Sequence, residues 1–320
     1  FIKMWKIIAG RLLSFVPTII IASMILFLAV NVVPGSAARA VLGIQATPQA
    51  IKRFEHKHGL DRPLYIQYAD WAGKAIKGDF GTSFQNSVAV GPEVAKRIPV
   101  TMLLASLAFG IAILIAVPLG ALAGMRHQKL SDGTITTLAT LFGSTPNFWL
   151  ATLLIYLLAL KFSWFPTGGY VPFQDSFLGS LKSLCLPAIS LGLVSSGLLI
   201  RIMRAAVIET MESNHIDTAI SKGVGPRRLF FRHVLRNSII PFLTVGAVEF
   251  GFLVGSVVII EDVFRIPGIG SLVLVGIINR DYPVLLAASM AITLIVLLVN
   301  FLADLSAQLI DPRQVKNVRN

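Results

Sequence analysis

Residues able to catalyse a reaction or bind a metal are sparse and scattered along this chain. Its five histidines form no His-Glu-x-x-His pair, and one cysteine, Cys185, allows neither an intrachain disulfide nor a Cys-x-x-Cys site. No Gly-x4-Gly-Lys-Ser/Thr phosphate loop occurs, so ATP hydrolysis would need another subunit. The segment Pro267-Gly-Ile-Gly270 is no dinucleotide fingerprint, because no strand–helix unit surrounds it. The residues therefore predict a chain that is not an enzyme.

One acidic residue, Glu249, interrupts a long apolar stretch, residues 237–260, that has no other Asp, Glu, Lys or Arg. An ionisable group inside a membrane span is costly and tends to face a cavity or a partner. One interpretation makes Glu249 a polar wall of a translocation path. The other makes it a neutral buried carboxyl, or a group hydrated near the interface. The residues alone leave both open.

The segment 201–236 combines basic residues with apolar residues at helical spacing. The apolar positions are Met203, Val207, Met211, Ile216, Ala219 and Ile220. This pattern predicts an amphipathic helix at the membrane surface. Gly223-Val-Gly225-Pro226 should end that helix, because a glycine can turn the chain sharply and a proline cannot continue the helix. Arg227 and Arg228 open a second basic stretch that leads back to the bilayer.

Composition places the chain in the membrane class. Of its 320 residues, 55% are hydrophobic and 14% are charged, whereas soluble domains carry about 25% charged residues. The mean hydropathy is +0.76. The net charge of +12 is explained better by basic loops that orient membrane helices than by a nucleic-acid partner.

Six apolar stretches are long enough to cross about 30 Å of hydrocarbon as helices. They are residues 12–38 (apolar to about 33), 100–125, 133–160, 183–200, 237–260 and 282–303. None alternates as a barrel strand does. The expected fold is therefore an all-α polytopic membrane protein, a single transmembrane domain over residues 1–320.

The short loops orient this bundle. Loops on one side carry most of the Lys and Arg, including Lys3, Lys6, Arg11 at the start and Arg313, Lys316, Arg319 at the end. Short basic loops stay on the cytoplasmic side. Both termini and segment 201–236 are therefore expected inside the cell, and segment 34–99 outside.

The outer segment 34–99 should form a small helical insert. Thr47-Pro48 is typical of a helix start, Gly59 of a helix end, and Pro63 of a second start. Tyr65, Tyr68 and Trp71 follow on neighbouring turns. They either offer a docking surface for a partner protein or pack the insert onto the membrane helices.

Two glycine pairs, Gly120/Gly124 and Gly251/Gly255, have the four-residue spacing of closely packed membrane helices. Each pair could lie at a contact between helices or subunits, or could occur by chance in a glycine-rich apolar chain.

Six ordered blocks of sequence resemble the permease subunits of ATP-binding-cassette importers, in the first-permease (B-type) branch of the dipeptide/oligopeptide (peptide/nickel) family. The cytoplasmic signature of these permeases is Glu-Ala-Ala, three residues, Gly, and Asp217-Thr218-Ala219 with Gly223 takes its place here. The other blocks are Val33-Pro34-Gly35, then Gly59 to Leu64, then Gly78 to Gly81, then Glu261 to Phe264 with Pro267 to Gly270 and Arg280 to Pro283, and Asp311-Pro312-Arg313.

The resemblance implies a function and a set of partners. The chain would form a translocation path, working by alternating access, with a second homologous permease in a prokaryotic inner membrane. Two cytoplasmic ATPases would bind ATP-Mg, so this chain needs no cofactor, and an extracytoplasmic binding protein would deliver a di- or oligopeptide. The residues implied to couple to the ATPases are Asp217, Thr218, Ala219, Lys222, Gly223, Arg227 and Arg228.

The competing hypothesis is a secondary transporter or channel that works without ATPases. Against it, the spans show no paired interrupted helices and no obvious inverted repeat.

Overall fold

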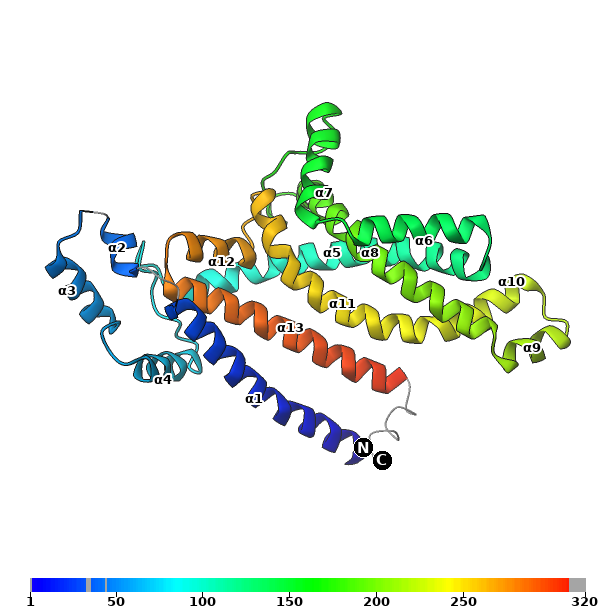
Figure 1. Cartoon of the computed structure of the whole chain (residues 1–320), viewed down its shortest axis with the longest axis horizontal. Coiled ribbons are helices and arrows are strands. Elements are labelled where there is room, and N and C mark those ends of the chain that lie inside the picture. The colour runs from blue at the N-terminus through cyan, green and yellow to red at the C-terminus, as the bar shows by residue number, and fades with distance from the viewer. Residues whose placement is uncertain (1, 33–35, 44, 311–320) are drawn as a thin grey trace. The chain divides into compact units, whose positions relative to one another are not determined.

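The computed structural model describes residues 2–32, 36–43 and 45–310. The blocks at 33–35 and 311–313, together with Lys316 and Arg319, lie outside the described residues, as do the side chains of Lys3, Lys6 and Arg11. The elements follow the order α1 Ile2–Val32, α2 Ala37–Leu42, α3 Pro48–His58, α4 Leu64–Ala75, α5 Val90–Met125, α6 Leu130–Gly143, α7 Asn147–Leu154, η1 Ile155–Lys161, α8 Phe177–Met211, α9 Asn214–Ser221, α10 Pro226–Leu229, η2 Phe230–Val234, α11 Leu235–Val263, α12 Ile269–Ile278 and α13 Tyr282–Ile310 (Figure 1).

The expectation of an all-α membrane protein is confirmed for the described part of the chain, whose only β pairing is an isolated bridge between Thr82 and Ala89. Four helices are long and apolar enough to cross a membrane, namely Val90–Met125, Phe177–Met211, Pro226–Val263 and Tyr282–Ala303. A bent pair, α6 with α7 and η1, makes a fifth, and α1 has an apolar stretch at Phe15–Asn31. The six expected spans fall on these elements.

The third expected span, residues 133–160, is wrong as a single straight helix. The chain bends by 99° between α6 and the α7–η1 helix. Ser144 ends α6, and Pro146 precedes α7. Proline disfavours helical backbone at the residue before it, here Thr145, and lacks the N–H needed to continue the ladder. The apolar composition predicts the length of this span correctly but does not show the break.

The chain forms two compact units, residues 1–102 with 265–295 and residues 103–264 with 296–320, and the expectation of one domain stays a prediction. In the first unit, the insert has the expected helix starts and stops. The Thr47 side chain accepts a hydrogen bond from the Ala50 N–H (3.3 Å), and Gly59 takes a left-handed φ of 68°. Three helices, not two, occupy the insert, because Ser36 caps the additional short helix α2.

The insert aromatics divide between packing and exposure. Tyr68 and Trp71 lie 5.5 and 6.0 Å from the ring of Phe27 in α1, and the hydroxyl groups of Tyr68 and Ser23 are 2.9 Å apart. Tyr65 points outward, with 74% of its surface exposed. The packing interpretation therefore holds for Tyr68 and Trp71 but not for Tyr65.

Helix α8 is the centre of the second unit. Of its apolar window, 72% is buried, against 33% or less in each of the other three long helices. Glycines let its neighbours approach. A Cβ atom at Gly120 of α5 would lie 2.6 Å from Met203 Cβ, and one at Gly124 would lie 2.7 Å from Val207 Cβ. On another side, a Cβ at Gly197 would lie 2.4 Å from the Ala139 carbonyl oxygen of α6.

The two glycine pairs noted in the sequence therefore differ. Gly120 and Gly124 form a close contact between α5 and α8. In the second pair, a Cβ at Gly251 would lie 3.0 Å from Asn300 Oδ1, whereas nothing lies within 4 Å of one at Gly255.

We expect Gly120→Ala to lower the free energy of unfolding by about 1–3 kcal/mol, because the added methyl group overpacks a rigid contact. The Gly120 Cβ position is also 2.7 Å from the Ile200 carbonyl oxygen, which is backbone and cannot move aside easily. Thermal unfolding in detergent measures the effect. Gly110→Ala in the same helix is the control, because nothing lies within 4 Å of its Cβ position. Equal melting temperatures for the two variants would contradict this prediction.

Candidate functional site

The signature segment consists of the end of α8, the short helix α9 and the turn that leads into α10 (Figure 1). The single amphipathic helix expected over this segment is wrong, because α8 ends at Met211 and α9 begins at Asn214. Glu212 and Ser213 form the corner, where Ser213 takes an extended conformation (φ −86°, ψ 142°). The apolar spacing does carry a sign of this corner, because Met211 and Ile216 are five residues apart instead of three or four.

Helix α9 has one buried face and one exposed face. Ile216 is fully buried and joins an apolar cluster that contains Met203, Val207 and Val234. Ala219, one turn later, is 6% exposed. Its small side chain faces the bundle, so α9 can lie close against the other helices. Asp217 and Thr218 are exposed, and so is Ile220, which the apolar spacing had grouped with Ile216 and Ala219.

A glycine with left-handed backbone ends α9. Gly223 has a φ of 73°, and its N–H donates to the Ile220 carbonyl (2.8 Å). The N–H of Val224 donates to the Ala219 carbonyl (3.2 Å). These two bonds form a Schellman motif, which satisfies the carbonyl groups at the helix end. Residues with a Cβ atom are strained at such a φ, so this turn requires the glycine that the sequence places there.

The basic part of the segment follows directly. Arg227 and Arg228 lie on α10 and are exposed, as is Lys222 before the turn. The helix then continues through a π-helical stretch, η2, into α11 without a break. The exposed residues of α9, the turn and α10 thus form one continuous surface, defined by Asp217, Thr218, Ile220, Lys222, Gly223, Arg227 and Arg228, which we call the coupling surface.

Hydrogen bonds fasten the coupling surface to the helices behind it. The Ser238 hydroxyl in α11 donates to the Ala206 carbonyl (3.1 Å) and to the Thr210 hydroxyl (3.0 Å) of α8. Asn237 Nδ2 lies 3.1 Å from His215 Nε2 at the start of α9. The helices before and after the coupling surface are therefore tied to each other.

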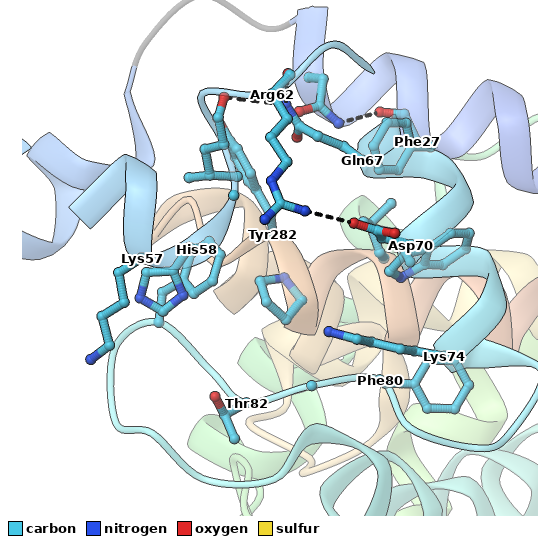
Figure 2. A pocket seen from close by; sticks show the side chains of 18 of the residues that line it. Phe27, Lys57, His58, Arg62, Gln67, Asp70, Lys74, Phe80, Thr82 and Tyr282 are labelled. Carbon is cyan, nitrogen blue, oxygen red and sulfur yellow. Dashed lines mark hydrogen bonds and ion pairs between the residues drawn. The ribbon is translucent and has the colours of Figure 1, made fainter. Parts of the chain in front are cut away.

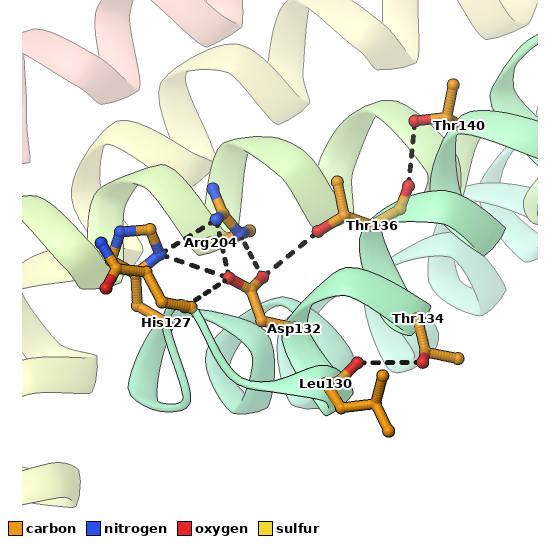
Figure 3. Close-up of polar contacts among 8 residues, drawn as sticks. His127, Leu130, Asp132, Thr134, Thr136, Thr140 and Arg204 are labelled. Atoms are coloured by element: carbon orange, nitrogen blue, oxygen red, sulfur yellow. Dashed lines mark hydrogen bonds and ion pairs between the residues drawn. The ribbon is translucent and has the colours of Figure 1, made fainter.

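A buried ion pair holds α8 seven residues before its end (Figure 3). The Arg204 guanidinium donates from Nε to Oδ1 of Asp132 and from a terminal nitrogen to Oδ2 (2.8 Å). Asp132 lies in the first turn of α6 with only 6% of its side chain exposed. The Gln128 N–H (3.1 Å) and the Thr136 hydroxyl (3.3 Å) also donate to it, and His127 Nδ1 is 3.2 Å away.

This clamp joins two segments that are distant in sequence, residues 127–136 and Arg204. Two-pronged arginine–carboxylate contacts fix orientation as well as distance. Arg204 therefore fixes α8 against the α5–α6 turn, beside the close contact of Gly124 with Val207. The sequence analysis missed the pair because residues 132 and 204 are far apart. The available signal was an acidic residue at the start of one apolar helix and a basic residue near the end of another.

Glu249, the candidate path residue, lies in the middle of α11 and is half-buried. Ser195 of the neighbouring helix α8 lies close to its carboxyl group. Part of Glu249 stays accessible. This arrangement agrees with a polar wall and also with a buried, partnered carboxyl group, and the role of Glu249 stays a prediction.

Comparison with known protein families decides the class of this chain. The model described as "Binding-protein-dependent transport system inner membrane component" matches residues 116–316, and its N-terminal companion matches residues 4–105. The chain belongs to this family. It is therefore a multi-pass membrane component of a binding-protein-dependent transport system, and the resemblance seen in the sequence blocks is confirmed.

Relatives match this transport component along nearly its whole length. A Brucella abortus protein named as a peptide transport system permease is 36% identical over 310 residues, which cover 97% of this chain and 99% of that protein. The oligopeptide transport system permease protein AppB of Bacillus subtilis is 30% identical over 309 residues, covering 96% and 98%. These relatives are transport permeases.

Solved structures share the fold of this component. A chain of the MetNI methionine ABC transporter in an inward-facing conformation superposes with a TM-score of 0.57 at 16% identity, covering 68% of this chain and 96% of that one. A chain of an amino acid ABC transporter gives 0.52 at 18% identity, covering 68% and 94%. Membership of the family implies that the chain works with an ATPase and other components of the transport system.

We expect Arg204→Ala to destabilise the protein by about 1.5–3 kcal/mol, because the buried Asp132 carboxylate would lose its two charge-assisted hydrogen bonds and keep only Gln128, Thr136 and His127. The double variant Asp132→Ala with Arg204→Ala should recover part of this loss, since no charge is then stranded. Thermal unfolding of the single and double variants measures both terms. Arg201→Ala, one turn earlier and exposed, is the control. A double variant that loses as much stability as the sum of the two single variants would show that the pair contributes no coupling.

Proposed function

We propose that the chain is the permease subunit of an ATP-driven importer of di- or oligopeptides, and that the coupling surface is where the ATPase acts on it. The observation that carries the proposal is the geometry of α9. Its apolar face is fixed in the bundle core, while its other face is exposed and carries charged and polar residues. A force applied to such a helix is passed to the bundle and is not lost in a flexible loop.

The route from α9 into the membrane is short. Ile216 touches the cluster that contains Met203 and Val207 of α8. In that same region the Asp132–Arg204 clamp and the Gly120 and Gly124 contacts hold α8 to α5 and α6. Movement of α9 driven by the ATPase would therefore move α8 and its neighbours together, which suits alternating access by rigid groups of helices.

The proposed assembly contains this chain, a second homologous permease, two cytoplasmic ATPases that bind ATP-Mg, and an extracytoplasmic binding protein. The chain itself would have no enzymatic activity and no cofactor. Both termini and the coupling surface would lie in the cytoplasm, and the insert at 34–99 outside a prokaryotic inner membrane. The excess of Lys and Arg in the short loops supports this orientation.

A short peptide is the proposed cargo. Support comes from the names of the Brucella abortus and Bacillus subtilis relatives, which cover 97% and 96% of the chain. The apolar spans also contain few charges besides Glu249. A path of this kind suits recognition of peptide backbone groups better than recognition of one charged side chain.

Peptide uptake tests the function as a whole. Proteoliposomes that contain the complete complex should accumulate a labelled peptide only when ATP is supplied. Uptake that proceeds without ATP would instead support the secondary transporter or channel hypothesis. Uptake of nickel or a sugar with no uptake of peptide would reject the cargo.

Cysteine labelling tests the orientation in a Cys185→Ala background. Lys77→Cys in the insert should react with a membrane-impermeant maleimide in intact spheroplasts, whereas Arg228→Cys on the coupling surface should react only after permeabilisation. Both positions are exposed. The opposite labelling pattern would reverse the topology.

Gly223→Val tests the coupling surface. A residue with a Cβ atom in the left-handed region costs about 1–2 kcal/mol, and nothing lies within 4 Å of the added Cβ. The variant should therefore insert normally, lose transport, and show weaker ATPase association or uncoupled hydrolysis, because the turn that ends α9 is displaced.

The matched control is Gly225→Val, two residues further along. Its Cβ position is also free, but its φ of −65° suits any residue. We expect this variant to transport peptide at close to the wild-type rate. Wild-type transport by Gly223→Val would mean that this turn does not couple the permease to the ATPase.

A further inference from the structure

The first unit contains a cavity of about 380 Å³ that no transport role yet explains (Figure 2). One face of α4 lines it with Gln67, Asp70, Trp71 and Lys74, which follow one another at helical spacing. The end of α3, the loop at 79–84, the start of α13 and the end of α1 supply the other walls. Ligand pockets typically have volumes of about 300–1,000 Å³, so the size suits a small molecule.

Aromatic side chains form much of the lining. Phe27 and Trp71 lie 6.0 Å apart, and Phe84 and Tyr282 lie 6.2 Å apart, measured between ring centroids. Phe80 also lines the cavity. Such a wall can take an apolar or aromatic group of a ligand without requiring a particular side chain.

The charged groups of the cavity differ in what they are free to bind. Arg62 and Asp70 pair with each other at 3.1 Å. Lys74 extends across the cavity in Figure 2, and none of the described residues accepts a hydrogen bond from its ammonium group. Asp79 accepts one hydrogen bond, from the Gly81 N–H (2.9 Å), and forms no ion pair with the described cations. Among the described lining residues, Lys74 and Lys57 are thus cations without an ion pair, and Asp79 is a carboxylate without one.

The Lys74 and Asp79 side chains start from neighbouring points of the backbone. The Asp79 N–H donates to the Lys74 carbonyl at 3.0 Å, so the two residues are held together where α4 ends. His58, between the rings of Phe54 and Phe84 (4.4 and 4.6 Å), adds little positive charge. Burial lowers the pKa of its imidazole below the ordinary value, and Lys57 lowers it further. Figure 2 shows Lys57 pointing away from the cavity centre.

We propose that this cavity is a peptide-binding site on the outer part of the permease. Lys74 binds the terminal carboxylate, Asp79 binds the terminal ammonium, and the aromatic wall holds one peptide side chain. The proposal rests on the proposed peptide-import function and adds a place where a peptide is held before it is translocated.

The pairing of charges favours a peptide over an anion. A lipid headgroup or a free phosphate would be attracted by Lys74 but repelled by the Asp79 carboxylate. A short peptide carries one charge of each sign, separated by about 3.3–3.6 Å per residue. The flexible Lys74 side chain can adapt to peptides of slightly different length, which suits cargo of mixed sequence.

Equilibrium binding of radiolabelled Ala-Phe to the full chain in phosphatidylcholine nanodiscs tests the site. Lys74→Glu should raise the Kd about tenfold or more, since a charge-assisted hydrogen bond is replaced by repulsion. Lys77→Glu, one turn away and outside the lining, should leave the Kd unchanged. The C-terminal amide of Ala-Phe should bind wild type as weakly as Ala-Phe binds Lys74→Glu.

Three results would contradict the proposal of a peptide-binding site. They are an unchanged Kd in Lys74→Glu, equal binding of Ala-Phe and its amide, and displacement of Ala-Phe by inorganic phosphate or phosphatidylglycerol nanodiscs at equal effective concentration. ATP-driven uptake of Ala-Phe by the wild-type complex is measured in parallel. It distinguishes failure of the proposed cavity site from failure of the proposed import function. If uptake is normal while any of these three results is found, only the cavity assignment is wrong.

Discussion

The close approach of α5 to α8 is the contact on which the rest of the second unit depends. Gly120 and Gly124 leave no room for a side chain at this contact. In a membrane, where the surroundings are as apolar as the helices, such close packing and interhelical hydrogen bonds take the place of the hydrophobic effect. The ion pair of Asp132 with Arg204 then fixes rotation and height at one end of the same contact. Because α8 is held in this way, we expect it to move together with α5 and α6.

The same rigid packing supports the signature segment that follows α8. Helix α9 is only eight residues long, and an isolated helix of that length is marginal in water. It persists because Ile216 and Ala219 are buried and because the Gly223 turn satisfies its last carbonyl groups. A short helix with one fixed face and one free face can receive a mechanical input. The family to which the chain belongs works with an ATPase, which would supply that input.

The first unit is held together by a different kind of contact. Its insert packs through aromatic contacts of Tyr68 and Trp71 with Phe27, and it leaves an open cavity that is lined with charged residues and held by turns. Surface units of this kind can bind ligands, because loops and short helices expose polar groups that membrane helices cannot. The proposed peptide site and the proposed coupling surface therefore belong to different units of the chain.

The sequence by itself determined the class, the number and order of the apolar stretches, the helix ends at Thr47, Gly59 and Gly223, and the family. Each of these depends on local composition, capping residues or short motifs, which act over a few positions. Only the tertiary structure decided where the third span bends, that α8 and α9 are separate helices, and which residues meet in the Asp132–Arg204 clamp and the outer cavity. The bend was visible in principle at Pro146, but apolar composition conceals a break when both sides are equally apolar. The clamp and the cavity join positions far apart in the sequence, and no local pattern records which distant partner satisfies a buried charge.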